Sequence, residues 1–468
     1  MKNQEDFMTG LTSCFQYLPK SVFTATLILV YLFMTAGLVH AEGEDASARM
    51  TIMEAIRIAL ADNHELKAMK NAALAQEKDI GIARSLFLPR IFIEERYLQT
   101  TNPGYAFMSR LNQARIVQQD FNPSSLNHPD PISDFQSSLT VEQPLFMKKA
   151  LVGLDISKTE AQARNAELGR RREDVAYQVV RACLTIVSAR EFLRAADQGV
   201  EDAREHHRVA LTRFSNGVGQ YADTLRTSTA LTDARQKRNV AEKNLHLARR
   251  GLGLLLGMTG AADVEDATLP LHRKELPYYV NAAVARSDLQ AAELRVKNAS
   301  NSVRMAEAGY FPYIGAAGTY QLHDHNHPFG SEGSNWQVGA FLRWDLFDGT
   351  RREYERSKSM QLSSQAREQV AALKKGIDYR IYEAYLNVEE AVKNVDLARE
   401  SLQAAREGTR LIKARYENGL SPLTELLNAQ TSLEQARTGM AAQENASKIA
   451  LATLCHESGT ILQDLNIE

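Results

Sequence analysis

Two hydrophobic patterns each occur twice along this chain, one with the period of a packed helix and one with the period of a strand. In Val175–Phe214, apolar residues and alanines recur at alternating spacings of four and three. The positions 202 residues later, from Ile377 to Tyr416, keep the same spacing. Such a sustained heptad pattern is typical of a coiled-coil seam, in which alanine allows helices to approach closely. We therefore predict two long, closely packed helices.

The predicted helices are much longer than those of an ordinary domain. No proline occurs between Met147 and Asn216. About 70 helical residues extend about 105 Å at a rise of about 1.5 Å per residue. A compact domain is far narrower than this, so the helices are rods. Asn-Gly pairs at 216–217 and 418–419 mark chain reversals, which predicts helical hairpins over 147–257 and 349–457.

Four segments of about ten residues alternate between apolar and polar positions. The clearest begins at Trp336, which faces away from Gln337. The first segment is less regular, because one of its faces carries the charged residues Arg90, Glu94 and Arg96. Such segments are typical of a transmembrane β-barrel, although a half-buried soluble sheet alternates too. The predicted strands cover about 89–100, 135–146, 311–324 and 335–348.

The chain also repeats its own order of motifs. Ala83–Ile91 resembles Ala306–Ile314 at an offset of 223 residues, and Arg213–Gly217 resembles Arg415–Gly419 at an offset of 202. The change of offset places a net 21 extra residues in a loop of the first half, around 100–134. Internal similarity of this kind predicts repeated structural units. The predicted repeats cover 42–270 and 271–468.

The N-terminal segment has the pattern of an export signal. An apolar run from Ser21 to Val39 follows Lys20 and precedes Ala41, after which acidic residues begin. This pattern predicts a signal peptide over residues 1–41. An uncleaved membrane anchor is the alternative, because the run is just long enough to span a bilayer. No later stretch approaches about 18 apolar residues, so other membrane contact requires strands or a surface helix.

Composition excludes several classes of protein. Lys and Arg total 55 against 57 for Asp and Glu, and the net charge of -2 argues against a nucleic-acid binder. Three cysteines without a C-x-x-C motif make neither a disulfide framework nor a structural zinc site. The sequence contains no G-x-S-x-G, phosphate-loop or H-E-x-x-H motif. We therefore expect neither an enzyme nor a bound cofactor or metal.

Four strands cannot close a barrel by themselves, and open sheet edges are not tolerated in lipid. The chain must therefore associate with further copies. Two copies supply eight strands, whose interior the side chains fill, and three copies supply twelve strands around a lumen. A trimer also suits paired helical halves that form a ring of rods below the barrel.

The order of these motifs resembles a known family, the TolC-like outer-membrane efflux proteins. The resemblance spans roughly residues 50–460, nearly all of the predicted mature chain. No single motif is decisive, but their order in two halves is highly specific. The matching motifs are Thr51–Leu60 with Asn63–Leu66, Leu88-Pro89, Gln143–Phe146, Trp344–Gly349, and the tips Arg213–Gly217 and Arg415–Gly419 with Asp223 and Glu425 after them.

The resemblance implies a mixed α and β fold and a homotrimer. Four strands per chain form a twelve-stranded transmembrane β-barrel, which a long periplasmic α-helical barrel of coiled-coil hairpins continues. The implied function is passive conduction across the cell outer membrane in tripartite efflux or type I secretion, with a periplasmic adaptor and an inner-membrane pump. Drug, metal and polypeptide substrates are not separable by sequence. The alternative is a periplasmic coiled-coil structural or adaptor protein without a membrane barrel.

The hairpin turns are the candidate docking site for the adaptor. The Asn-Gly pairs permit the positive φ that reverses the chain, and the residues beside them are apolar or small. A plain helical turn with no further role is the alternative. By resemblance, the docking residues are Gly217, Val218, Gly419, Leu420 and Ser421.

The candidate gate lies just beyond the tips. By resemblance, Glu425 and Asn428 line the constriction, and a contact between Tyr416 and Asp223 holds the mouth shut. We expect this contact to be a hydrogen bond from the phenol to the carboxylate. Ser421 occupies the position at which an arginine often completes the latch. The alternative is that the carboxylates only complement the dipoles of their helices.

Histidines supply a further candidate site. His323, His325 and His327 alternate along a predicted strand and so share a face that suits a divalent metal. The favoured interpretation is polar filling of an outer loop, because Asp324 is the one carboxylate and no thiol accompanies them. His206 and His207 are expected on the surface of the rod.

Two further expectations concern the rods and the loops. Cys183 and Cys455 lie at similar distances from the two tips, and we expect both to be free thiols. The segments 101–134 and 325–335 should be outer loops, at the pole opposite the hairpin tips.

Overall fold

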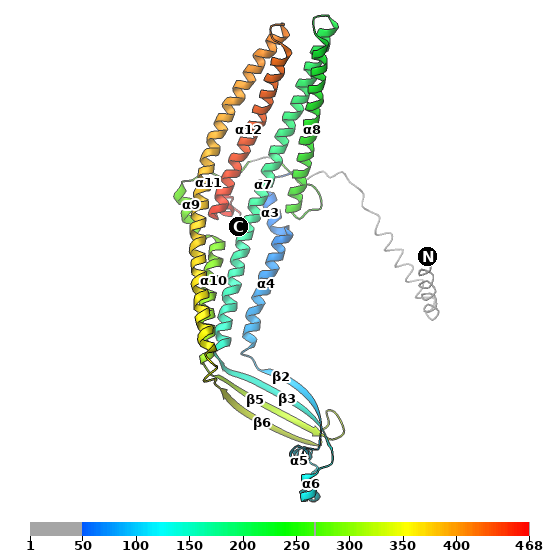
Figure 1. Cartoon of the computed structure of the whole chain (residues 1–468), viewed down its shortest axis with the longest axis vertical. Helices are drawn as coiled ribbons and strands as arrows, with labels where there is room; N and C mark the ends of the chain where they lie inside the picture. Colours follow the sequence, from blue (N-terminus) through cyan, green and yellow to red (C-terminus); the bar gives the residue numbers. More distant parts are fainter. Residues whose placement is uncertain (1–48, 266–267, 468) are drawn as a thin grey trace, which may run out of the picture. The chain divides into compact units, whose positions relative to one another are not determined.

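Long helices and a four-stranded sheet make up most of the computed structural model, which describes residues 49–265 and 268–467 (Figure 1). This combination confirms the mixed α and β class predicted from the sequence. The predicted signal peptide, residues 1–41, lies outside the described residues. Of the helices in the described ranges, none is both long and apolar enough to cross a membrane.

The longest helices form two antiparallel hairpins. α7 (Lys148–Ser215) packs against α8 (Tyr221–Leu255) in the first hairpin. α11 (Arg351–Glu417) packs against α12 (Leu423–Ser458) in the second. Contacts between α7 and α12 join the two hairpins along their length.

The heptad seam is the packed side of each long helix. In α11 the seam residues are buried from Ile377 to Ala391, mostly half-buried farther along, and buried again at Thr409 and Tyr416. In α7 the seam is buried or half-buried from Val175 to Ala210, whereas Phe214 at its end is exposed. A narrow apolar stripe therefore packs helices whose other faces are polar.

Shorter helices lie beside the rods (Figure 1). α3 (Ile52–Asp62) and α4 (His64–Ser85) contact α7, while α10 (Ser287–Glu307) contacts both α7 and α11. A capping box starts α3, with Thr51 and Glu54 each accepting a hydrogen bond from the other's amide. The remaining short elements near the rods are β1 (Arg49–Met50), β4 (Asp263–Val264), α9 (Leu276–Ala282), η2 (Ala283–Ala285), η3 (Ala308–Tyr310) and α13 (Ile461–Asp464).

The main apolar core lies where the hairpins meet these short elements. β1 pairs with β4 in parallel, so the start of the described chain is tied to the segment after α8. Complete burial of one large aliphatic side chain contributes about 1.5–3 kcal/mol, so this cluster fixes the junction of the two halves. Fully buried members include Ile52, Ile56, Leu184, Ile186, Ile381, Leu454 and Ile461.

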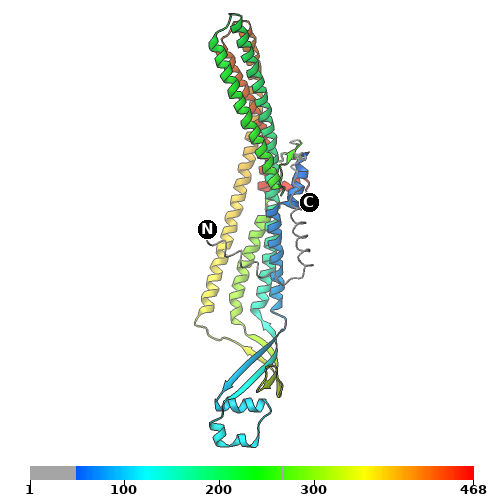
Figure 2. The same ribbon diagram turned by 90° about the vertical axis from the view of Figure 1, so that its right-hand side faces the viewer.

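The sheet is antiparallel, with the strand order β2-β3-β5-β6. Its strands are β2 (Arg90–Thr100), β3 (Ile132–Met147), β5 (Tyr313–Asp324) and β6 (Gly333–Arg343). The hairpin turns lie at the opposite pole from this sheet (Figure 1, Figure 2). Within the described residues, β2 and β6 each pair on one side only, so both edges of the sheet are open.

The register gives the sheet one mainly apolar face, on which Glu95 is the charged exception in β2, and one mainly polar face. Ile93, Leu139, Tyr320 and Trp336 lie in one row across the four strands, and Ile93 and Trp336 are 70% and 73% exposed. The next row on the opposite face is Phe92, Thr140, Thr319 and Gln337. The charged residues that made the first strand irregular, Arg90, Glu94 and Arg96, all belong to this opposite face.

The fourth strand is shorter than predicted. The alternating pattern extends to 348, but β6 ends at Arg343. Arg352 explains this end, because its guanidinium donates to the carbonyls of Asp345 at 2.8 Å and Leu346 at 2.9 Å. Trp344 donates its indole N–H to the Tyr310 carbonyl at 3.1 Å. These side-chain contacts replace strand pairing beyond Arg343.

The first outer loop is partly helical. The sequence predicts a loop over 101–134, where Asn-Pro pairs act as turn signals. In the structure Asn102 and Asn122 are N-caps, and each accepts from the amide of the residue two positions on, at 3.1 and 3.2 Å. The proline that follows each cap suits the first helical turn. The helical pieces are α5 (Pro103–Asn112), η1 (Gln118–Phe121) and α6 (Pro123–Asn127), beyond the strands (Figure 2).

Candidate functional site

The two hairpin turns have the same backbone geometry. Gly217 and Gly419 have φ angles of 75° and 73°, a left-handed conformation that favours glycine. The amides of Val218 and Leu420 donate back across their turns, at 3.0 and 2.8 Å, as in a Schellman motif. The Asn-Gly pairs therefore reverse the chain for the same physical reason in both hairpins.

The predicted docking residues present apolar side chains at the turns. Val218 and Leu420, which are equivalent positions, are 68% and 69% exposed. Gly217 and Gly419 are exposed beside them. Ser421 differs, because it is buried and its hydroxyl donates to the Glu425 carboxylate. The exposed docking candidates at each tip are thus a glycine followed by an aliphatic residue.

Two of the predicted gate residues share a solvent-facing side of α12. Glu425 and Asn428 are both exposed and are three residues apart, so they are neighbours on the helix surface. Leu423 and Leu426 point the other way and are buried against Tyr416 in a small apolar cluster. The buried leucines fix the orientation of α12, so the side of the helix that carries Glu425 and Asn428 faces solvent.

The expected hydrogen bond between Tyr416 and Asp223 is not present. Asp223 is near enough for its charge to act on the phenol, and its carboxylate lies 3.9 Å from Arg226. Burial raises the pKa of Tyr416, and the negative charge of Asp223 adds to this effect against the positive charge of Arg213. Among the described residues, the structure gives the Tyr416 hydroxyl no hydrogen-bond partner.

Arg213 makes a polar contact between the hairpins at this end. Its guanidinium lies 5.1 Å from the centre of the Tyr416 ring, and Nη1 donates to the Tyr416 carbonyl at 2.9 Å. A cation over an aromatic face and a charged donor to a carbonyl are both stabilising. Sequence reasoning included Arg213 only in the tip motif, because nothing in the sequence shows which hairpin its side chain contacts.

A cavity of about 160 Å³ lies between the hairpins, lined by residues of α7, α8 and α12. His206 is one of its lining residues, is only 5% exposed, and has no hydrogen-bond partner at Nε2 in the described structure. Burial lowers the pKa of His206. The neighbouring His207 contacts Thr227, with 3.0 Å between Nδ1 and Oγ1. The prediction of a surface pair is therefore wrong, because position 206 faces the second hairpin.

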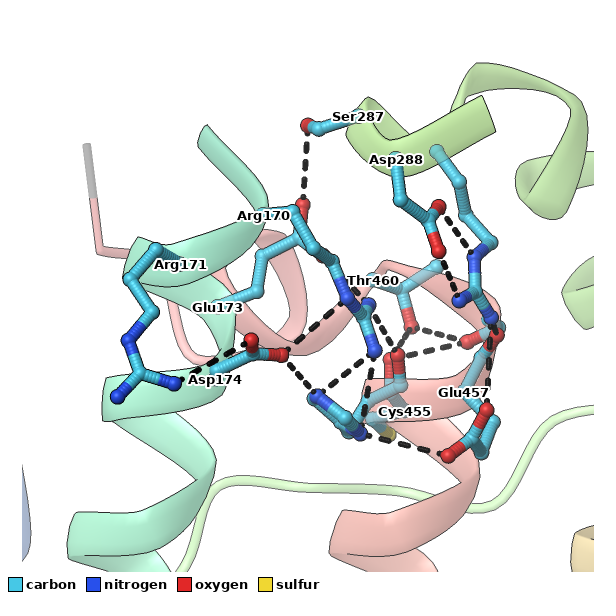
Figure 3. A network of polar contacts seen from close by, with 12 residues as sticks. Arg170, Arg171, Glu173, Asp174, Ser287, Asp288, Cys455, Glu457 and Thr460 are labelled. Carbon is cyan, nitrogen blue, oxygen red and sulfur yellow. Dashed lines mark hydrogen bonds and ion pairs between the residues drawn. The ribbon is translucent and has the colours of Figure 1, made fainter. Parts of the chain in front are cut away.

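A polar network joins the two halves beside the apolar core (Figure 3). Arg170 of α7 pairs with Glu173 at 2.8 Å and donates to the His456 carbonyl of α12 at 2.9 Å. His456 Nε2 lies 2.8 Å from an Asp174 oxygen. Burial lowers the pKa of His456, but its contacts with Asp174 and Glu457 outweigh this effect, so the pKa is above the usual histidine value.

Arg286 is the buried cation of the same network. Its side chain is 2% exposed, lies 2.7 Å from Asp288, and donates to the Glu457 carbonyl. Hydrogen bonding by His456 lowers the pKa of Glu457 to about 2. The network therefore connects α7, α10 and α12 through paired charges rather than isolated ones, as burial requires.

Both cysteines of the rods are free thiols in the core. Cys183 and Cys455 are buried, and no disulfide joins them. Burial raises the pKa of each thiol to about 12. The sequence suggested free thiols, and their chemistry in the folded chain is that of small apolar side chains.

The three alternating histidines do not form one site. β5 ends at Asp324, so only His323 keeps the strand conformation. His323 is buried with Nδ1 3.0 Å from an Asp134 oxygen, whereas His325 Nδ1 lies 2.6 Å from Glu332. The loop turns before the strand pattern can bring the imidazoles together. Glu332 supplies a carboxylate that sequence reasoning missed, because the loop folds back to bring it close.

Comparison with known proteins gives consistent matches over most of the chain. A family model described as Outer membrane efflux protein matches residues 55–258 and 278–460. The chain is 25% identical over 429 residues to Protein CyaE of Bordetella pertussis, which covers 88% of this chain and 85% of that protein. It is 20% identical over 427 residues to Outer membrane efflux protein BepC of Brucella suis, and this match covers 90% of this chain and 87% of that protein. A crystal structure of a membrane protein from Pseudomonas aeruginosa matches with a TM-score of 0.76 at 18% identity, over 88% of this chain and 93% of that one.

Proposed function

Since this chain belongs to the outer membrane efflux protein family, as its motifs predict, we propose that it is a channel that conducts substrates passively out of the periplasm. It is a protein of the cell outer membrane. We propose that it acts in tripartite efflux or type I secretion and receives substrate from a periplasmic adaptor and an inner-membrane pump. The helical hairpins extend into the periplasm and the sheet lies in the outer-membrane lipid.

One observation carries this proposal, namely the exposed apolar face of the four-stranded sheet. Its row of Ile93, Leu139, Tyr320 and Trp336 is typical of a lipid-facing barrel wall, and the polar face opposite suits a water-filled lumen. The open edges at β2 and β6 require partners in lipid. We propose that three chains close a twelve-stranded barrel. A periplasmic adaptor or structural protein without a membrane barrel is not expected to expose such an apolar face.

We propose that the chain is built as an internal repeat, with residues 42–270 and 271–468 as its halves. The order of two strands and a long hairpin supports this, since β2, β3, α7 and α8 are followed by β5, β6, α11 and α12. Three chains then place six hairpins in a ring that continues the barrel. The repeat supports the proposed trimer because two similar hairpins per chain make a near-regular ring.

The gate and docking roles are assigned to the helical tips. Glu425 and Asn428 line the constriction in the proposed trimer, with Tyr416 and Asp223 beside it. The exposed Val218 and Leu420 support adaptor docking, because aliphatic side chains at a polar pole favour a protein partner. A photo-reactive amino acid at Leu420 should capture a periplasmic adaptor in cells, and one at Leu397, an exposed residue of α11 farther from the turn, should not.

The proposed channel is tested with the full chain extracted in detergent. Chemical cross-linking should give a trimer, and the same sample in a planar lipid bilayer should give discrete conductance steps. A heat-denatured sample is the control, and it should give neither result. A monomer that remains inactive in the bilayer would contradict both the trimer and the channel.

A further inference from the structure

A group of potential metal ligands lies in and beside the loop that joins β5 to β6. Asp324 ends β5, is only 6% exposed, and has its carboxylate fixed by the loop backbone. Its Oδ1 accepts from the amide of Asn326 at 2.7 Å and from that of His327 at 2.8 Å. Gly330 passes so close that an added Cβ would lie 2.1 Å from Oδ2. The loop thus holds one carboxylate in a defined position.

His325 and Glu332 complete a group of three potential ligands. His325 Nδ1 lies 2.6 Å from Glu332 Oε1, and its amide donates to Oε2 at 3.2 Å. One ligand atom each from Asp324, His325 and Glu332 lies within 4.8 Å of both others. In the described part of the chain, this is the one such group of His, Cys, Asp and Glu side chains.

The return of Glu332 to this position is set by the fold. Gly333, the next residue, begins β6 and lies so close to α5 that an added Cβ would be 1.9 Å from the Asn112 carbonyl oxygen. The start of β6 is therefore packed against α5, and the end of β5 is fixed by its pairing with β3. The ligands are presented from two anchored strand ends rather than from a free loop.

We propose that Asp324, His325 and Glu332 bind one divalent transition-metal ion at the outer end of the sheet. One imidazole and two carboxylates suit Zn²⁺, Cu²⁺, Ni²⁺ or Co²⁺, whereas Ca²⁺ and Mg²⁺ prefer oxygen ligands throughout. Bonds of about 2.1 Å hold tetrahedral ligand atoms about 3.4 Å apart, so His325 Nδ1 and Glu332 Oε1, which lie 2.6 Å apart, separate slightly on binding. Water completes the coordination, because Glu332 is at the surface.

The ion would cross-link the ends of β5 and β6. His325 Nδ1 must exchange its contact with Glu332 for a bond to the metal as both side chains bind it. Two carboxylates beside one another are favourable around a cation, which offsets their mutual repulsion. The result is a loop whose conformation depends on metal, at the pole opposite the helical tips.

Isothermal titration with ZnCl₂ tests this site in the full chain, purified in detergent without a histidine tag and first treated with a chelator. We expect one Zn²⁺ per chain. His325→Ala and Glu332→Gln should each weaken binding at least about tenfold. His327→Ala is the matched control, since the hydrogen bond of this residue to Asp324 comes from its backbone amide, and it should bind nearly as tightly as the wild type does.

A spectroscopic arm identifies the ligands directly. Cu²⁺ bound at this site should give an electron paramagnetic resonance spectrum with coupling to a single imidazole nitrogen, and His325→Ala should abolish that coupling. The proposal is overturned by the absence of stoichiometric Zn²⁺ binding, by equal binding in His325→Ala and the wild type, or by a loss of binding in His327→Ala. None of these outcomes depends on channel activity.

Discussion

The guanidinium of Arg213, at the end of the first long helix, lies 5.1 Å from the centre of the Tyr416 ring, at the end of the second. The same guanidinium donates to the Tyr416 carbonyl at 2.9 Å. The contact therefore depends on the ring and the backbone of Tyr416, and not on its hydroxyl. Because the two residues belong to different hairpins, their contact resists separation of the tips.

The first prediction concerns this contact in the proposed gate. Arg213→Met removes both interactions, which together are worth about 2 kcal/mol, or roughly a thirtyfold shift between closed and open arrangements. Single-channel conductance or open probability in planar bilayers should therefore rise. Tyr416→Phe keeps the ring and the carbonyl and should change either quantity little.

Arg415→Met is the matched control for Arg213→Met. Arg415 occupies the equivalent position of the second hairpin, but its guanidinium reaches only the Leu420 carbonyl of its own turn, at 3.4 Å. Equal increases in both variants would show that any charge loss at the tips loosens the mouth, which would contradict a specific role of Arg213.

The second prediction concerns block of the channel by cations. Glu425 is exposed on α12, and a trimer brings three copies to the proposed constriction. Like charges that converge in a narrow mouth attract divalent cations. Glu425→Ala should therefore weaken Mg²⁺ block of the conductance, while Glu417→Ala, an exposed carboxylate at the end of α11, should leave it unchanged. Equal effects of both variants would argue against a ring at 425.

The third prediction concerns pH and the network beside the core. The folded-state pKa of His456 is above its usual value, because Asp174 and Glu457 outweigh the effect of burial. Protonated His456 thus stabilises the fold below about pH 6.5, and this stability is lost as pH rises through the folded pKa. The melting temperature of the wild-type protein, followed by circular dichroism, should fall as the pH rises from about 6.5 through the folded-state pKa of His456. His456→Gln should reduce this dependence.

The effect of pH on stability has the opposite sign at His206, so the contributions of His206 and His456 can be measured separately. Burial lowers its pKa, so its neutral form is favoured in the fold and stability is lost as pH falls below about 6.5. His206→Gln should therefore reduce acid destabilisation and leave the alkaline side unchanged. His64→Gln, at an exposed position, is the control for both variants. An unchanged pH profile in His456→Gln would contradict the assigned role of the network.

The fourth prediction concerns thiol chemistry. Cys183 and Cys455 are buried and their pKa values are raised to about 12, so almost no thiolate exists at pH 8. A maleimide should not label the folded protein and should label both residues after denaturation without a reductant. Cys14 lies in the predicted signal peptide, so labelling confined to Cys183 and Cys455 also tests removal of the segment that contains Cys14. Absence of labelling after denaturation would indicate a disulfide.

Sequence reasoning located the elements that depend on local periodicity. The heptad spacing indicated which side of α11 is buried, because each seam position from Ile377 onward repeats the same local environment. The alternation of apolar and polar residues that begins at Trp336 likewise indicated on which face of the sheet this side chain lies. Both patterns depend only on residues that are close in the sequence, so they can be recognised without knowledge of distant contacts.

The contacts that depend on distant residues could not be predicted in this way. Arg213 contacts Tyr416 across 203 positions, and Arg352 ends β6 by binding carbonyls that the alternating pattern assigns to a strand. Glu332 reaches His325 only because the loop closes after Asp324. The Asn102-Pro103 pair predicts a turn, but Asn102 is a helix cap, because an asparagine side chain accepts from a nearby backbone amide in either structure.

The apolar face of the sheet should contact membrane lipid, and tryptophan fluorescence tests this contact directly. The chain has two tryptophans, so Trp344→Phe leaves Trp336 as the single fluorophore on that face. A second variant with both tryptophans replaced and Phe341→Trp places the fluorophore on the opposite face. In vesicles of brominated lipid, we expect strong quenching of Trp336 and little quenching of a tryptophan at position 341. Equal fluorescence of Trp336 in brominated and ordinary lipid would contradict the contact with lipid.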